Sequence, residues 1–417
     1  MTAELRSPQA DRLREDWEAL ARIRDDGLAG WTRQTFSEPE RDSREWVAGL
    51  MRRAGLATRV DPIGNVIGEL AGTDPNAAAI VIGSHTDTVA GGGRFDGVIG
   101  VLGAIEVVRL LAESGIRLRH PLRVVDYYNE EPNRFGLSCI GSRALAGNLR
   151  PEHLSLVDDE GVTLADALVA DGRAPDRVRE CAWAPREVAA SLELHIEQGP
   201  VLESEGASLG VVTAIAGIAR LRARFSGRRD HAGTMPMDRR HDASCSAAGA
   251  VLAIERIAAA GAGAVGTVGE IRLTPEATNV VTADALVTAE FRSSDPRWFA
   301  QARAALDDAV AEESARRGVA GAVDWLPPEP PTAMDTAVSA VLADGIGLLG
   351  HEARRLYSGA GHDAVQLARL APAGMIFTPS QDGRSHAPEE WTDLADVALG
   401  VHALGQGVVL LDERSDR

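Results

Sequence analysis

The segment GSHTDTVAGGGRFDG, residues 83–97, places one histidine and two aspartates close together after an apolar stretch. His85 and Asp87 are two residues apart, so their side chains point to the same side of an extended chain. Such a pair is typical of a metal-bound imidazole that a carboxylate holds in one tautomer. It is equally typical of a loop histidine that bonds to a nearby aspartate. The pair alone leaves both interpretations open.

Asp96 lies in the glycine-rich part of this segment, GGGRFDG, and its setting favours the metal interpretation. The glycines around it let the backbone approach a carboxylate closely and adopt dihedral angles that other residues avoid. The alternative is an ordinary glycine-rich turn in which Asp96 caps the helix predicted for residues 98–115.

Glu130 and Glu131 follow a second apolar segment, LRVVDYY, residues 122–128. Adjacent residues project differently, so one carboxylate can bind a metal while its neighbour acts as general base on a metal-bound water. Two solvated glutamates before Pro132 are the usual alternative. The carboxyl end of a buried strand is where α/β proteins place their ligands, and this position favours a functional pair.

Two further histidines occur in settings that suit metal binding. His195 lies in LELHIEQGP, where apolar and polar residues alternate as in a strand, and His386 lies in a loop after an apolar segment. The candidate ligands then form a mixed set of imidazoles and carboxylates: His85, Asp96, Glu131, His195 and His386. Such a set suits Zn²⁺, Mn²⁺, Co²⁺ or Ni²⁺. If Asp96 is shared, two metal ions about 3.5 Å apart can be held.

The elements that must position these side chains are those of an α/β fold. A strand at 77–85, a helix at 98–115 and a strand at 122–128 follow one another, which is the pattern of a parallel crossover unit. Two helices, at 13–23 and 42–54, precede it.

The pattern changes in the middle of the chain. From residue 209 the order of strands and helices suits a small sheet with two helices on one face, and the proline-rich WLPPEPPTAMD ends this stretch. We therefore predict one catalytic α/β domain, formed by residues 1–208 and 331–417, that is split by an inserted module of residues 209–330.

The composition is that of an ordinary globular protein, with 45% hydrophobic and 25% charged residues among 417. Acidic residues outnumber basic ones by 61 to 43, which argues against nucleic acid as a partner. All of the basic residues are arginine, so Schiff-base chemistry of lysine is excluded. Three scattered cysteines and the lack of a long apolar run predict a cytoplasmic protein with no membrane partner.

Seven sets of motifs, in this order, resemble the hydantoinase/carbamoylase group of dinuclear metal amidohydrolases, within the clan of aminoacylase-like peptidases. They are GSHTDTV with GGGRFDG, NEEPNRFG with GSRALAG, LELHIEQGPVLE, GRRDHAGTMPMDRRHDA, TNVV, SGAGHDA and PSQDGRSHAPEE. The resemblance runs from about residue 20 to 400. It implies a mixed-sheet, dinuclear metallopeptidase-like catalytic domain with an inserted α+β domain of four strands and two helices that serves dimerisation and acts as a lid.

The resemblance also implies a role for each candidate side chain. One metal ion would be held by His85, Asp96 and His195, and the other by Asp96, Glu131 and His386. Glu130 would be the general base, and Asp87 would buttress His85. Two divalent ions per subunit are expected, with Zn²⁺ favoured and Mn²⁺, Co²⁺ or Ni²⁺ as alternatives.

For the inserted module the resemblance implies a homodimer in which His231 enters the partner subunit's site and polarises the scissile carbonyl. Without the resemblance, His231 would be taken as a surface histidine beside a glycine. Asn279 and Arg292, joined by Gln198, match residues that bind the substrate's carboxylate. Backbone contacts to the substrate would come from Gly359, Ala360 and Gly361.

Three positions depart from the pattern of the family. Pro132 stands where many relatives have glycine, Glu290 where aspartate is common, and Arg384 where an apolar residue is expected. None is a proposed metal ligand. Arg384 bears on the substrate, because it lies close to His386 in the chain.

The predicted function is hydrolysis of the carbamoyl C–N bond of an N-carbamoyl-L-amino acid by water that two metals activate and Glu130 deprotonates. Allantoate, ureidoglycolate, β-ureidopropionate and N-acyl-amino acids are alternative substrates, because the metal chemistry is the same for all. A metal-binding homologue without catalysis is a remote alternative, since base and ligands are all present.

Overall fold

The computed structural model describes residues 4–414, which form two compact units. The first unit consists of the residues up to Thr213 and those from Met334 onward, and the second consists of Ala214–Ala333. The insert predicted from the sequence, residues 209–330, starts earlier than the second unit of the structure, because the run after Leu209 resembles one continuous strand. The structure divides this run into two strands, and the first of them pairs within the sheet of the first unit.

The larger sheet of the chain is mixed and has nine strands, most of which belong to the first unit. They are β1 (Ala57–Val60), β2 (Val66–Leu70), β3 (Ala79–His85), β4 (Leu122–Tyr127), β5 (Val188–Ile196), β6 (Gly210–Ile215), β11 (Thr332–Ala333), β12 (Arg354–Ser358) and β13 (Ala373–Thr378). Their order is β1-β2-β4-β3-β5-β13-β6-β11, and β12 also pairs with β6. The central pairs β4·β3, β3·β5 and β5·β13 are parallel. The predicted mixed α/β fold is confirmed.

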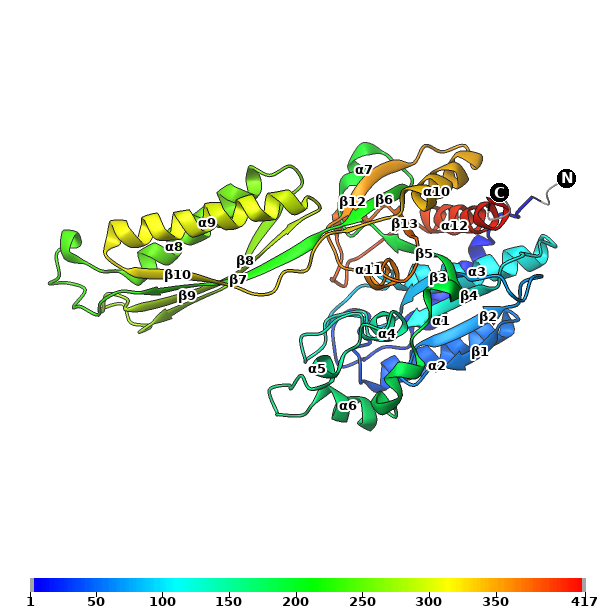
Figure 1. Cartoon of the computed structure of the whole chain (residues 1–417), viewed down its shortest axis with the longest axis horizontal. Coiled ribbons are helices and arrows are strands. Elements are labelled where there is room, and N and C mark those ends of the chain that lie inside the picture. The colour runs from blue at the N-terminus through cyan, green and yellow to red at the C-terminus, as the bar shows by residue number, and fades with distance from the viewer. Residues whose placement is uncertain (1–3, 415–417) are drawn as a thin grey trace. The chain divides into compact units, whose positions relative to one another are not determined.

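Helices cover both faces of this sheet. One face carries α1 (Ala10–Ala21), α2 (Glu38–Arg53), α3 (Val98–Glu113), α10 (Thr336–Leu348) and α12 (Leu394–Arg414). The other carries α4 (Ile140–Leu145), α6 (Leu164–Ala170) and α11 (Ala364–Leu367). Because strand side chains alternate between faces, Ile80 and Ile82 pack in the first core, whereas Val81 packs in the second. Figure 1 shows α3 beside β3 and β4.

The remaining helical segments of this unit are short. They are α5 (Pro151–Leu154), α7 (Val201–Glu205) and the 3-10 turns η1 (Pro175–Glu180), η2 (Pro185–Glu187) and η4 (Gln381–Gly383).

Four neighbouring strands end at the sheet edge that carries the predicted site. His85 is the last residue of β3, and His195 is the last but one of β5. Glu130 follows β4, and His386 lies in the loop after β13. Since β4, β3, β5 and β13 are adjacent and parallel, their carboxyl ends meet at one edge, where open α/β sheets bind their ligands.

The second unit has one antiparallel sheet and two long helices. Its elements are β7 (Gly217–Ser226), η3 (Met237–Arg239), α8 (Ala243–Ala259), β8 (Val265–Thr274), β9 (Asp284–Ser293), α9 (Pro296–Arg317) and β10 (Ala320–Trp325). The strands lie in the order β10-β7-β9-β8. Both helices pack on the same face of this sheet, around a core of alanine, leucine and phenylalanine side chains (Figure 1). This confirms the predicted module of four strands and two helices.

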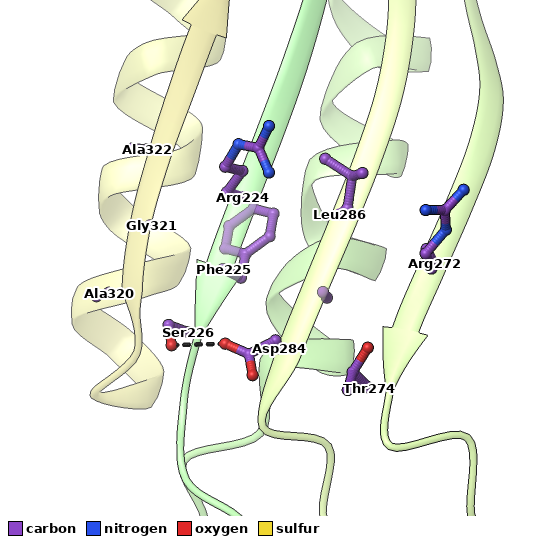
Figure 2. A pocket seen from close by; sticks show the side chains of 11 residues that line it. Arg224, Phe225, Ser226, Arg272, Thr274, Asp284, Leu286, Ala320, Gly321 and Ala322 are labelled. Carbon is purple, nitrogen blue, oxygen red and sulfur yellow. Dashed lines mark hydrogen bonds between the residues drawn. The ribbon is translucent and has the colours of Figure 1, made fainter. Parts of the chain in front are cut away.

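The second unit also contains a hollow of about 390 Å³, shown in Figure 2. Arg224 of β7, Leu286 of β9 and Arg272 of β8 line it, and the Ser226 hydroxyl donates to Asp284 at 2.7 Å. None of the predicted metal ligands lines this hollow, because all of them belong to the first unit.

One helix corrects the expectation that no apolar stretch could span a bilayer. By length and composition, α12 is long and apolar enough to do so, with a mean hydropathy of 1.7. Its apolar residues, among them Val401 and Leu404, pack against α3 and α10 within the core. Core helices of globular proteins commonly meet the same criterion.

Candidate metal centre

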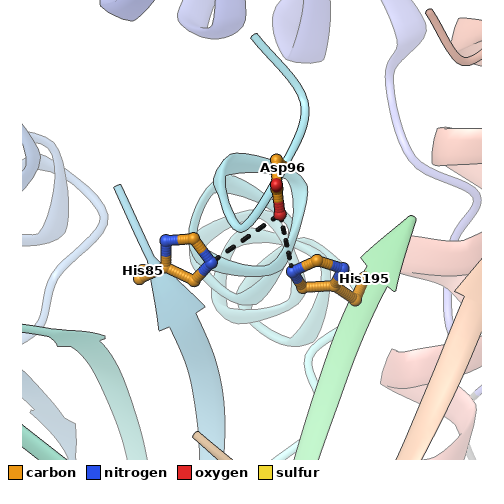
Figure 3. A group of neighbouring side chains, drawn as sticks. All are labelled: His85, Asp96 and His195. Carbon is orange, nitrogen blue, oxygen red and sulfur yellow. Dashed lines mark ion pairs between the residues drawn. The ribbon is translucent and has the colours of Figure 1, made fainter. Parts of the chain in front are cut away.

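Three imidazoles converge on the carboxylate of Asp96, just before α3. His195 Nε2 lies 3.1 Å from Asp96 Oδ1, and His85 Nε2 lies 3.8 Å from the same oxygen. Figure 3 shows both rings turned toward this carboxylate. The other oxygen, Oδ2, lies 3.1 Å from His386 Nε2. No side chain caps the N-terminus of α3, so the alternative role of Asp96 as a helix cap does not apply.

The potential ligand atoms form two sets that share Asp96. One set is His85, Asp96 and His195, the other is Asp96, Glu131 and His386, and within each set all ligand atoms lie within 4.8 Å of one another. Glu131 Oε1 is 3.3 Å from His386 Nε2. Each Asp96 oxygen therefore faces a different set, as in a carboxylate that bridges two metal ions.

The hydrogen bonds of the two buried histidines leave Nε2 as the metal-binding atom. His85 Nδ1 donates to the carbonyl oxygen of Asp87 at 3.0 Å, and His195 Nδ1 donates to that of Ile196 at 2.9 Å. In the neutral imidazoles this places a lone pair on each Nε2, which faces carboxylate oxygen. Two acceptors that face each other repel unless a proton or a metal cation lies between them, and a set of imidazole nitrogens and carboxylate oxygens fits a divalent metal.

The electrostatics of the cluster also favour added positive charge. The hydrogen bonds of His386 to Asp96 and Glu131 raise its pKa to about 11. Burial opposes charge on His85, but the carboxylates of Glu130, Asp87 and Asp96 outweigh it and raise the pKa of His85 well above its usual range. Burial likewise opposes charge on Asp96, yet its histidine partners lower its pKa well below the ordinary value. A bound metal would supply the charge that these carboxylates attract.

Glu130 stands next to the metal ligands without belonging to either set. Its Oε2 lies 3.8 Å from His85 Nε2, and the Cys139 thiol donates to its Oε1 at 3.5 Å. Burial raises the pKa of Glu130 well above the usual range, although His85 opposes this, and the side chain is only 9% exposed. Glu131 is buried as well, which rules out the alternative of a solvated acidic pair. The position of Glu130 suits a general base.

Asp87 supports the centre in a different way from the one expected. The sequence predicts that its carboxylate holds His85, but that carboxylate lies 3.6 Å from His85 Nδ1, and the hydrogen bond comes from the backbone carbonyl instead. The carboxylate accepts the amide hydrogens of Glu130 and Glu131, each at 3.1 Å. Asp87 thereby links the segment of His85 to that of the paired glutamates.

The predicted substrate-binding residues divide between the two units. Gln198 lies at the centre itself, where its Nε2 donates to Asp96 Oδ2 at 3.0 Å while its buried Oε1 has no hydrogen-bond partner among residues 4–414. Gly359 and Ala360 line a cavity of about 750 Å³ that also includes His386. An added Cβ at Gly361 would meet open space.

The other three predicted residues belong to the second unit. The exposed His231 forms a bridge to Val280, and Asn279 accepts the amide hydrogen of Ala232 with its carbonyl, so these two loops adjoin. His231 Nδ1 accepts amide hydrogens from Gly233 at 3.0 Å and Thr234 at 3.2 Å. Arg292 Nε donates to Glu290 at 2.7 Å, on the sheet face that is turned away from α8 and α9.

Sequence reasoning missed Glu390, which organises the Asp96 segment. Its buried carboxylate accepts the amide hydrogens of Phe95 at 2.9 Å and Asp96 at 3.0 Å through Oε1, and the Ser385 hydroxyl at 2.7 Å through Oε2. It therefore ties the segment of Asp96 to the loop of His386. The side chain occupies the space that a Cβ on Gly93 would need. The acidic pair in HAPEEW was the available signal, but nothing in its spacing shows which acid is buried.

A second supporting group lies behind His195. Glu193, His195 and His362 form a third set of potential ligand atoms within 4.8 Å. The His362 ring packs edge-on against His195 at 4.5 Å, and burial lowers the pKa of His362 well below its ordinary value, which keeps it neutral. Glu193 accepts from the Ser84 hydroxyl at 2.7 Å and from the amide of Ala364 at 3.1 Å. This set shares His195 and so forms the support of the same centre.

The matches to known proteins agree with this geometry. The model of peptidase family M20/M25/M40 matches residues 81–408, which is most of the chain and spans every predicted ligand. The chain belongs to this family. Within this M20 chain the matched region includes all of the second unit and most of the first.

Three relatives illustrate the closer similarity. An N-carbamoyl-L-amino acid amidohydrolase of Geobacillus stearothermophilus is 39% identical over 401 residues, covering 95% of this chain and 97% of the relative. A ureidoglycolate hydrolase of Oryza sativa is 35% identical over 409 residues, covering 96% of this chain and 84% of the relative. The crystal structure of a hydantoinase/carbamoylase family amidase from Burkholderia ambifaria has a TM-score of 0.88 and 37% identity, covering 98% of each chain. The predicted family and enzyme class, a hydrolase of C–N bonds other than peptide bonds, are confirmed.

Gly97→Ala should destroy the first metal set. A Cβ at this position would lie 2.4 Å from His85 Nε2, so the ring must leave its place. We expect the affinity for divalent metal to fall by more than about tenfold, measured by competition with a chromophoric chelator. Gly91→Ala is the matched control, because both glycines have a φ of 68° but nothing lies within 4 Å of a Cβ at Gly91. Equal metal affinity in both variants would contradict the assignment.

Glu390→Ala should weaken metal binding without touching a ligand. The substitution leaves the buried amides of Phe95 and Asp96 without an acceptor, and we expect the metal affinity to fall by about 10- to 100-fold. Glu390→Gln should restore most of it, because its carbonyl oxygen can still accept both hydrogens. Chelator competition measures the affinity, and a melting curve confirms folding. Wild-type affinity in the alanine variant would show that Glu390 does not position Asp96.

Proposed function

We propose that this chain hydrolyses the carbamoyl C–N bond of N-carbamoyl-L-amino acids, using two divalent metal ions per subunit, with Zn²⁺ favoured. The observation that carries the proposal is the pair of ligand sets that share Asp96, with Glu130 beside them. The similarity to relatives named N-carbamoyl-L-amino acid amidohydrolase supports the substrate class. Two imidazole and carboxylate sets of this kind are typical of metal-assisted hydrolysis.

The residues of this chain would carry the proton transfers. When bound, the metals would lower the pKa of water and polarise the carbonyl. Glu130 would take the proton of the attacking water, and the new C–O bond would form as the carbonyl π bond opens. The C–N bond then breaks, and the protonated Glu130 returns the proton to the leaving nitrogen. Loss of the whole carbamoyl group would release ammonia and carbon dioxide.

His231 would stabilise the developing charge on the carbonyl oxygen. Two backbone amides donate to its Nδ1, so its neutral form carries the proton on Nε2 and presents a hydrogen-bond donor. Asn279, next to His231, and Arg292 would hold the substrate's carboxylate, for which a guanidinium suits the two oxygens.

A homodimer would bring these groups to the metal centre of the partner subunit. Apolar side chains that are exposed on the second unit support this part of the proposal. Leu252 of α8 is 60% exposed and Ile271 of β8 is 52% exposed, and burial of such groups stabilises subunit contacts.

Ureido acids are the second candidate class of substrate. The relatives include proteins named ureidoglycolate hydrolase and probable allantoate deiminase, at 34–36% identity. In ureidoglycolate and allantoate, the ureido group carries the same kind of C–N bond next to a carboxylate. The same metal centre would therefore act on both classes.

Wild-type protein loaded with Zn²⁺, Mn²⁺, Co²⁺ or Ni²⁺ should release ammonia or amine fastest from N-carbamoyl-L-amino acids. The panel includes allantoate, ureidoglycolate, β-ureidopropionate and N-acetyl-amino acids. Glu130→Gln should lower kcat by about 10²- to 10⁴-fold, because the amide cannot accept the proton of water. The variant protein should still bind both metals. A Glu130→Gln protein with bound metal and wild-type turnover would refute the base assignment. Faster turnover of allantoate than of every carbamoyl compound would favour the second class.

Heterodimers should show whether His231 acts across subunits. Glu130→Gln and His231→Ala chains with different tags are co-expressed, and doubly tagged dimers are isolated. If His231 acts in the partner's site, one of the two sites of the mixed dimer contains both an intact Glu130 and an intact His231. About half of the wild-type turnover is then expected, whereas the homodimer of each variant is nearly inactive. Dimers of a wild-type chain with a Glu130→Gln chain are the control. They should give about half of the wild-type turnover whether His231 acts in its own subunit or in the partner subunit. Inactive mixed dimers would show that His231 serves its own subunit, and doubly tagged protein that cannot be isolated would contradict the dimer.

A further inference from the structure

The cavity beside His386 lies entirely within the first unit and has a volume of about 750 Å³. Gln198 and His386 form the part that adjoins the metal centre. Arg355 and Tyr357 of β12 and Arg384 of the loop after β13 line the rest. A substrate whose carbonyl lies at the metals would thus have a neighbouring part in this cavity.

The cavity wall carries more cationic than anionic groups. Arg354, Arg355 and Arg384 line it, and the single carboxylate among the lining residues is that of Glu197. This carboxylate is already engaged, because it accepts the amide hydrogens of Val201 and Leu202, each at 2.8 Å, at the start of α7. It is therefore directed into the helix terminus.

The three arginines differ in how they are held. Arg354 forms two hydrogen bonds with Glu205, which fix its guanidinium on that side chain. Arg384 donates one bond to Glu389 from Nη2 at 2.9 Å, and both side chains remain about half exposed. A guanidinium has five N–H donors, so this single bond orients Arg384 and leaves other donors for a ligand. Arg355 follows Arg354 directly and is also exposed.

We propose that this cavity binds a second carboxylate, carried by the side chain of the substrate, through Arg355 and Arg384. The preferred substrates would then be N-carbamoyl derivatives of acidic L-amino acids, aspartate or glutamate. This inference rests on the proposed function. A guanidinium matches the two oxygens of a carboxylate, and an apolar side chain would remove water from two arginines without replacing their hydrogen bonds. The volume of the cavity is ample for a side chain of this length.

The test compares each acidic substrate with its uncharged counterpart of the same shape. N-carbamoyl-L-aspartate is paired with N-carbamoyl-L-asparagine, and N-carbamoyl-L-glutamate with N-carbamoyl-L-glutamine. In the wild-type protein kcat/KM should be about tenfold or more higher for the acid in at least one pair. Arg384→Gln and Arg355→Gln should each lower this ratio by about tenfold. Arg14→Gln is the control, because that exposed arginine of α1 pairs only with Asp11 among residues 4–414 and should keep the wild-type ratio.

The other possible results of this test distinguish a failure of the inference from a failure of the proposed function. A wild-type ratio at or below one in both pairs overturns the inference and leaves the proposed function intact. A high ratio that neither arginine variant changes overturns the assignment to this cavity. Equal losses for the acid and the amide would show that the arginines hold the α-carboxylate that all four compounds share. No turnover of any of the four compounds, with turnover of another ureido acid, would instead refute the proposed function.

Discussion

The centre depends on one carboxylate that must face two ways. Asp96 lies between β3 and α3, with Oδ1 toward His195 and His85 and Oδ2 toward His386. Such a position can be held only if the backbone around it is fixed, because a carboxylate that shifted by an ångström would leave both sets of potential ligand atoms. Gly97 allows His85 to pack against the chain after Asp96, and the carboxylate of Glu390 holds the amide of Asp96 itself. One support acts at the residue after Asp96, and the other acts at the amide of Asp96 itself.

The order of strands explains why residues far apart in the chain supply the other ligands. Parallel neighbours β4, β3, β5 and β13 bring residues 131, 85, 195 and 386 to a single edge. The crossover helix α3 starts at the same edge, so Asp96 arrives there as the chain turns from strand into helix. Each of these ligands thus lies at the end of its strand or in the loop that follows the strand.

This arrangement also explains what could be predicted from the sequence. Strand ends are recognisable, because an apolar run such as 122–127 stops where polar residues begin, and α3 is a long apolar segment that ends before Gly115. Short edge strands such as β1 and β12 carry little apolar signal, since nearly all of their residues are exposed or only partly buried. The run after Leu209 hides the change from β6 to β7, because the apolar start of β7 follows β6 after only one residue.

Supporting contacts were harder to predict than the ligands because they depend on which atom of a residue is used. Asp87 holds His85 through its carbonyl and the paired glutamates through its carboxylate, and spacing alone cannot distinguish these. Glu390 and Glu193 resemble surface acids in the sequence and become functional only because other segments cover them. Gln198 contacts Asp96 because the chain adopts a positive φ of 58° at this residue, which no local pattern indicates.

The buried acids around the centre connect its chemistry with the stability of the fold. Glu130, Glu131 and Glu193 all have a pKa raised above the ordinary value, chiefly by burial, and the same holds for Asp363. Asp363 Oδ2 has no hydrogen-bond partner within residues 4–414, although Oδ1 accepts from Ser142 at 2.5 Å. Burying this much negative charge is unfavourable unless cations offset it. Two divalent ions would offset this negative charge at the point where the acids converge. Metal binding would therefore serve catalysis and would also stabilise the strand ends that carry the acids.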